Sequence, residues 1–111
     1  MENNEFVSEL KKPNLQNCTK QELVEYYEDL KKEHAEYAKE CKIQALKEFM
    51  RGDYPEINEI LTTKQYIKLV VKKYDKEHAK FVRKADKALN YDLEVISKLK
   101  KINAVEEEHE I

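Results

Sequence analysis

Six uncharged residues recur at strict seven-residue spacing through the second half of the chain. They are Ile67, Tyr74, Phe81, Ala88, Val95 and Ile102. A companion row, less uniform, contains Val71, His78, Ala85, Asp92 and Leu99. Two such rows form the seam of a helix that packs against another helix. We therefore predict one helix over about residues 63–103, which continues through Asn90.

The first half of the chain has a seam of its own at helical spacing. It consists of Leu23, Tyr27, Leu30, His34, Ala38, Cys41, Ala45 and Phe49. Thr19 and Glu22 have the spacing of a capping box at a helix N-terminus. Gly52 is the residue type that ends helices in a left-handed conformation. These signals predict a second long helix over about residues 20–51.

The fold class follows from these two helices and from the residues that are rare. The 111 residues include one Gly, two Pro and no Trp, and few runs alternate with the period of a strand. Pro55 starts a short linker helix, and residues 1–12 predict a short amphipathic N-terminal helix that ends before Pro13. We predict an all-α antiparallel helical hairpin or bundle, with residues 1–103 as one domain and 104–111 as an acidic tail that frays.

The tetrapeptide Lys-Glu-His-Ala occurs at residues 32–35 and again at 76–79. Residues 19–42 align without gaps on residues 63–86, with seven identities in 24 positions. A repeat that includes both a cap and a seam indicates two stacked helical units. In an antiparallel pair with its turn near 52–62, His34 and His78 lie at nearly the same level and are expected to be close.

Two interpretations of this histidine pair compete. Asp75 and His78 have the spacing of a carboxylate and a histidine in helix-bundle metal sites, but Lys31 occupies the matching position of the first copy. The alternative is a polar layer that fixes the register of the two helices. We favour the polar layer and expect no metal, no cofactor and no catalytic grouping.

Charge is divided unevenly between the two long helices. Residues 19–51 carry seven basic and eight acidic side chains, a net charge of −1, whereas residues 63–103 carry twelve and five, a net charge of +7. We name two surfaces. The acidic stripe consists of Glu25, Asp29, Glu33 and Glu36, and the basic row consists of Lys68, Lys72, Lys76, Lys80 and Arg83.

Three functional interpretations remain open. The charges are two solvated faces, or the acidic stripe binds a basic protein, or the basic row binds nucleic-acid phosphates. We favour a non-catalytic protein-binding module, a small adaptor or inhibitor such as mobile elements encode, with a nucleic-acid-binding protein as the alternative. Apolar residues outside the seams favour a homodimer. No long apolar segment and no Cys-x-x-Cys pair is seen, so we expect a cytoplasmic protein with Cys18 and Cys41 as free thiols.

Overall fold

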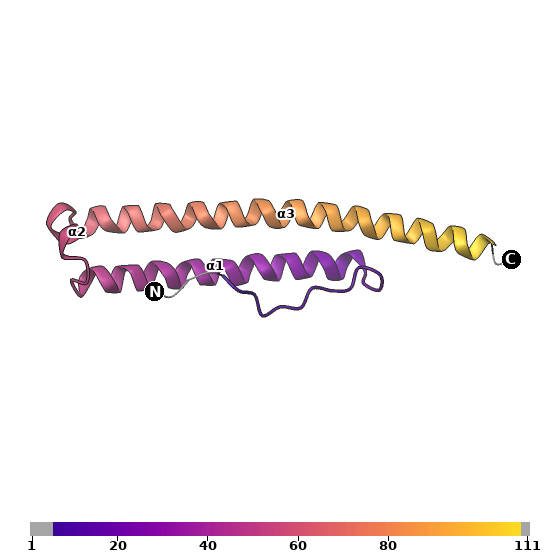
Figure 1. Ribbon diagram of the computed structural model, residues 1–111, viewed down its shortest axis with the longest axis horizontal. Helices are drawn as coiled ribbons and strands as arrows, with labels where there is room; N and C mark the ends of the chain where they lie inside the picture. The colour runs from indigo at the N-terminus through magenta and orange to yellow at the C-terminus, as the bar shows by residue number, and fades with distance from the viewer. Residues whose placement is uncertain (1–5, 110–111) are drawn as a thin grey trace.

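The computed structural model describes residues 6–109, and the side chains of residues 6–102. Within that range the chain is helical without strands, and it forms α1 (Lys20–Met50), α2 (Pro55–Ile60) and α3 (Thr63–His109). The all-α class is therefore confirmed. α1 and α3 lie in contact, and in Figure 1 they run in opposite directions from a turn that contains α2. α3 extends past the expected end near residue 103 and projects beyond the start of α1.

The ends of the long helices have the local interactions that their sequences predict. The Thr19 hydroxyl accepts a hydrogen bond from the Glu22 backbone N–H at 3.1 Å, so it satisfies one of the unpaired donors of the first turn. Thr62 and Gln65 form the reciprocal capping box of α3, with bonds of 3.2 and 2.9 Å. Gly52 ends α1 with a φ of +78°, which only glycine adopts without strain.

The seam predicted for the first long helix is confirmed. Leu23, Tyr27, His34, Ala38 and Phe49 are buried, and the other three members are partly buried. The two most enclosed apolar side chains, Leu23 and Ile96, belong to one core cluster that also contains Tyr27 and Ala85. At the turn end, Phe49 stacks on Tyr66 with ring centroids 4.2 Å apart.

The seam predicted for the second long helix is correct in its middle and wrong at both ends, where Ile67 and Ile102 are exposed. Val70 is buried with 6% of its surface exposed, whereas Val71 is 37% exposed and Ile67 is 40% exposed. At the other end, Ile96 is more enclosed than Val95. A helix with 3.6 residues per turn drifts away from a strict seven-residue repeat. The buried face therefore lies one residue earlier near the turn and one residue later at the far end.

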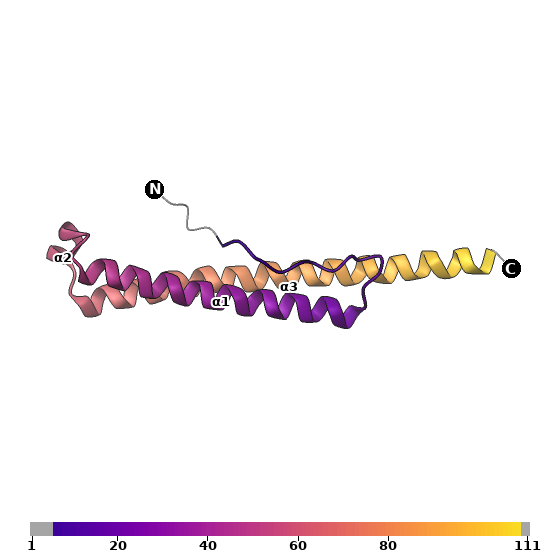
Figure 2. The same cartoon turned by 90° about the horizontal axis from the view of Figure 1, so that it is seen from below.

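The predicted N-terminal helix is absent from the described residues. Residues 6–14 have no regular secondary structure, and Asn14 starts a turn whose backbone accepts from Asn17 and Cys18. Figures 1 and 2 show this segment running back along the two long helices. A helix of so few residues is marginal in water, and Pro13 disfavours helical geometry in the residue before it. We call residues 6–13 the N-terminal strap.

Candidate functional site

The two histidines of the repeated tetrapeptide meet between α1 and α3. The Nδ1 atoms of His34 and His78 are 2.8 Å apart, which is a hydrogen-bond distance. His34 is buried, with 7% of its surface exposed, and His78 is partly buried. The repeat predicted that the two histidines lie at nearly the same level, and in the structure their rings are in direct contact.

Aromatic rings enclose His34 on several sides. Phe81 of α3 stacks on it in parallel, with centroids 4.0 Å apart and an interplanar angle of 4°. Phe6 of the N-terminal strap approaches His34 edge-on at 4.9 Å and Phe81 edge-on at 5.2 Å. Tyr37 of α1 completes the cluster, 5.4 Å from Phe6. The strap therefore places an aromatic ring against His34.

The surroundings of His34 oppose a positive charge on it. Burial away from water lowers its pKa below the usual value of 6.5, and the neighbouring His78 lowers this pKa further. The carboxylate of Glu77 acts in the opposite direction and raises the pKa of His34. The balance favours a neutral His34 near pH 7, and a neutral imidazole can accept or donate a hydrogen bond within the pair.

Among the residues that the structure describes, no third metal ligand accompanies the histidine pair. No group of three His, Cys, Asp or Glu side chains with metal-binding geometry occurs among the described residues. Asp75, the carboxylate whose spacing suggested a metal site, forms an ion pair with Lys42 of α1. Lys31, which occupies the matching position of the first copy, pairs with Asp86 of α3. These two ion pairs connect the helices.

A second polar contact lies deeper in the helix pair, and sequence reasoning did not single it out. Asp92 of α3 is 4% exposed, and it accepts a hydrogen bond of 2.6 Å from the Tyr27 hydroxyl. Lys12 of the strap lies 2.8 Å from the same carboxylate. Burial is the main cause that raises the pKa of Tyr27 to about 12, and the hydrogen bond to Asp92 is the second. The contact with Asp92 also raises the pKa of Lys12. The sequence signal was a single acidic residue in the companion row of the α3 seam.

The acidic stripe lies along α1 beside the strap. Glu25, Asp29 and Glu36 are exposed, whereas Glu33 is partly buried and its Oε1 has no hydrogen-bond partner among the described residues. Two hollows separate the stripe from the strap. One is lined by Leu10, Lys11, Pro13, Glu22, Glu25, Tyr26 and Asp29, and the other by Phe6, Val7, Glu9, Glu33, Glu36, Tyr37 and Glu40. No sequence pattern indicated that the chain itself forms one wall of this surface.

The basic row lies on the outer side of α3. All five of its residues are exposed, and at about 100° per residue Arg83 points opposite to the buried Asp92. None of the ion pairs within the described residues involves the row. Two acidic residues of α3, Asp75 and Asp86, are engaged by lysines of α1. The outer side of α3 therefore keeps its positive charge.

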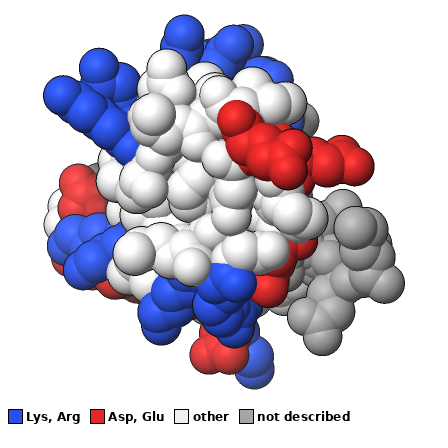
Figure 3. All heavy atoms as spheres, turned by 90° about the vertical axis from the view of Figure 1, so that its left-hand side faces the viewer, with Lys and Arg blue, Asp and Glu red and all other residues white. Residues whose placement is uncertain are grey.

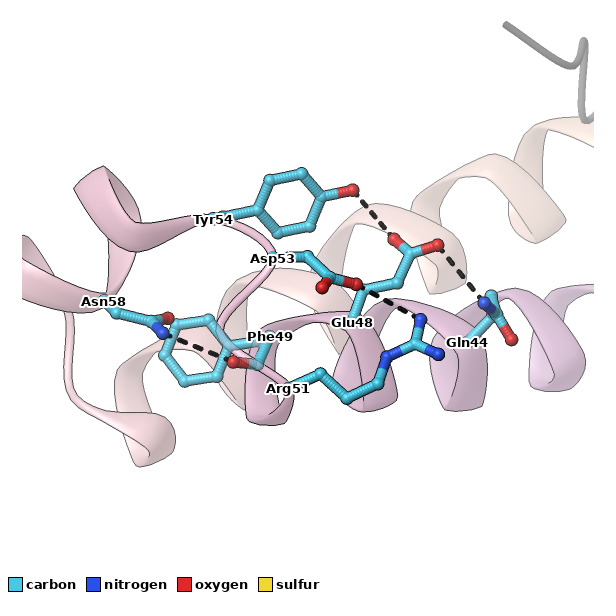
Figure 4. Close-up of polar contacts among 7 residues, drawn as sticks. All are labelled: Gln44, Glu48, Phe49, Arg51, Asp53, Tyr54 and Asn58. Carbon is cyan, nitrogen blue, oxygen red and sulfur yellow. Dashed lines mark hydrogen bonds and ion pairs between the residues drawn. The ribbon is translucent and has the colours of Figure 1, made fainter.

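The turn end of the molecule combines an ordered polar network with exposed apolar side chains. Glu48 accepts hydrogen bonds from the Tyr54 hydroxyl at 2.8 Å and from Gln44 at 3.2 Å, and these bonds lower the pKa of Glu48 (Figure 4). Met50 and Ile60 are 76% and 78% exposed. Viewed from this end, an uncharged face is bordered by charges of both signs (Figure 3).

No protein-family model, curated protein or solved structure matches the chain. The class that the structure defines is thus an all-α protein with two long helices in contact and a strap across them. Over the part of the chain that the structure describes, no helix is both long enough and apolar enough to cross a membrane.

Proposed function

We propose that the chain is a non-catalytic protein-binding module that recognises a basic partner through the acidic stripe. The unit of recognition is the antiparallel hairpin of α1 and α3, acting as a small cytoplasmic adaptor or inhibitor. Its partner presents Lys or Arg side chains at helical spacing, because the carboxylates of the stripe follow one face of α1. Complementary charge of this kind contributes association rate and specificity more than affinity.

One observation carries this proposal. The exposed carboxylates of Glu25, Asp29 and Glu36 take part in none of the ion pairs found among the described residues. Glu25 accepts a hydrogen bond from Gln21 at 3.0 Å, which leaves its charge unneutralised. The lysines of α1 that form ion pairs, Lys31 and Lys42, reach α3 instead. The stripe is therefore a row of negative charge available to a partner.

The test is affinity capture from the native host after nuclease treatment, with identification by mass spectrometry. Reversal of the stripe by Glu25→Lys, Asp29→Lys and Glu36→Lys is expected to abolish capture of the partner. The matched control changes the net charge equally at exposed positions elsewhere, by Glu56→Lys, Glu59→Lys and Glu94→Lys. The proposal is wrong if the stripe variant retains the partner, or if both variants lose it equally.

The second candidate is nucleic-acid binding by the basic row, which the exposure and unpaired charge of all five residues favour. Five phosphate contacts to duplex DNA predict a slope of about −4.5 in log K against log salt. Mobility-shift titrations of duplex DNA and of single-stranded RNA across salt concentrations test this. Absence of binding at low salt excludes nucleic-acid binding by the basic row. Binding that survives replacement of the five residues by Gln shows that another surface binds the nucleic acid.

A further inference from the structure

The contact between His34 and His78 has room for one proton between its two facing nitrogens. With the Nδ1 atoms 2.8 Å apart, one ring must donate an N–H and the other must accept with a lone pair. The accepting ring carries its own proton on Nε2. In this neutral state the pair links α1 to α3 through a part-buried hydrogen bond.

The first added proton leaves that bond intact. It binds the Nε2 of the donating ring, and the resulting imidazolium donates to its neutral neighbour in a charge-assisted hydrogen bond. The second proton has only one lone pair left to bind, which is the accepting Nδ1 itself. The bond is then lost, and two N–H groups on two positive rings point at each other. The pair therefore titrates in two coupled steps.

The groups packed around the pair do little to support a second charge. On α3, Glu77 is the carboxylate that favours protonation of His34, and Phe81 covers the ring. On α1, the Tyr37 ring lies 5.6 Å from His34. The strap contributes the uncharged ring of Phe6 at the pair, and its nearest described carboxylate, Glu9, lines the neighbouring hollow. A doubly protonated pair needs water, and water must enter past one of these elements.

The strap is held by fewer interactions at the histidine pair than α1 and α3. α1 and α3 are connected by ion pairs and by the packed seam. Phe6, in contrast, belongs to a segment without regular backbone hydrogen bonds and is held there by ring contacts with His34, Tyr37 and Phe81. We propose that the histidine pair is an acid-sensitive latch: its second proton opens the Nδ1–Nδ1 hydrogen bond and releases Phe6, which undocks the Phe6 end of the N-terminal strap, while the Lys12 end stays paired with Asp92.

Opening of the latch also changes the surroundings of the acidic stripe, the surface that we propose for partner binding. Phe6 and Val7 form one wall of the hollow whose other wall includes Glu33 and Glu36. Undocking of Phe6 removes one wall of that hollow and exposes Glu33, which is partly buried. The latch itself does not depend on the proposed function, and its test needs no partner.

The test is an NMR titration of the wild-type chain with 13C-labelled His and Phe rings, from pH 8 to pH 5. The range stops at pH 5, above the ordinary carboxyl pKa values near ~4. We expect the pair to bind its two protons in separate steps, the second at the lower pH, because only the second proton breaks the hydrogen bond between the rings. The Phe6 signals should move to their solvent-exposed values together with the second step. Phe49, stacked on Tyr66 at the turn end, is an internal control that should not move.

Two variants assign the effect to the pair. His78→Gln keeps a hydrogen-bonding side chain without the second titration, and Phe6 should then stay docked throughout the range. His109→Gln removes the histidine at the end of α3 and should change nothing. The latch is wrong if the two rings in the wild type bind protons independently of each other. It is equally wrong if Phe6 stays docked when the second proton binds, or moves in the same way in His78→Gln.

Discussion

At the scale of single residues, the polar side chains inside the helix pair determine how α1, α3 and the strap fit together. Asp92 is nearly enclosed, and two side chains from different segments, Tyr27 and Lys12, satisfy its carboxylate. A buried carboxylate without partners would cost several kcal/mol. The carboxylate therefore selects one register of α1 against α3 and anchors the strap to both.

Replacement of Tyr27 by Phe should destabilise the protein by about 1–3 kcal/mol, because Asp92 loses its short hydrogen bond while it stays buried. Urea unfolding followed by circular dichroism measures the change. Tyr91→Phe removes the hydroxyl of a tyrosine that is 67% exposed, and it should be nearly neutral. Equal effects of the two variants would contradict the structural importance of the Asp92 contact.

His34 predicts the direction in which stability changes with pH. Its pKa is lower in the folded protein than the usual 6.5, so the unfolded chain binds more protons in this range. The contribution of neutral His34 to the free energy of unfolding should be complete above about pH 7. It should fall as the pH drops through 6.5, by at most about 1.4 kcal/mol per pH unit. Urea unfolding at pH 7.5 and 5.5 measures this, and His34→Gln should flatten the dependence. Higher stability at pH 5.5 would show that the sign is wrong.

At the scale of the elements, the ends of the helices are encoded locally and the strap is not. Thr19 and Gly52 are recognisable from the sequence, because caps depend on neighbouring residues. The apolar residues of the strap suggested a helix, yet Phe6 and Lys12 are placed by contacts with residues of α1 and α3 that are distant in sequence. Tertiary contacts overrode a weak local preference.

Gly52→Ala should destabilise the protein by about 1–2 kcal/mol, because an L-residue is strained at a φ of +78°. The added Cβ would meet Asn58 Nδ2 at 3.8 Å, an ordinary contact, so the cost comes from the backbone conformation. Gly52→Asn should cost less, since Asn tolerates this region better. Thermal unfolding of the three proteins tests this order, and an Ala variant as stable as the Asn variant would contradict it.

A matched pair of valines tests the drift of the α3 seam. Val70→Ala removes buried methyl groups, whereas Val71→Ala removes partly exposed ones. Both substitutions change the helix propensity by the same amount. Val70→Ala should therefore be more destabilising by about 1 kcal/mol in urea unfolding. A strict seven-residue seam predicts the reverse, because Val71 belongs to its companion row.

At the scale of the whole molecule, the described part of the chain is a rod. Its Cα radius of gyration is 21.2 Å and its dimensions are 78 × 20 × 19 Å. A globular domain of about 100 residues has a radius of gyration of about 13 Å. A rod of two long helices has little interior, so many apolar side chains remain exposed, and seven of the eleven large exposed ones lie between residues 43 and 71. This distribution favours self-association at the turn end.

Small-angle scattering with light scattering tests the homodimer. A monomer should give a radius of gyration near 21 Å, and a dimer joined at the turn end should nearly double the longest dimension of 78 Å. Ile60→Asp should dissociate that dimer, whereas Tyr91→Asp, also at an exposed apolar position, should not. A monomer at every concentration would rule out the homodimer, and a dimer that keeps the original length would place the contact along the sides.

The sequence by itself determined the helical class, the long helices, their caps and the seam of α1, because these depend on periodicity and on residues a few positions apart. The repeat also located the two histidines at one level. The tertiary structure decided which residues of α3 face α1, since the drift of a real helix depends on its partner. It also decided the place of the strap, the partners of Asp92, and whether the rings of His34 and His78 touch. Each of these depends on contacts between residues from distant parts of the chain, and no local sequence pattern specifies which distant residues come into contact.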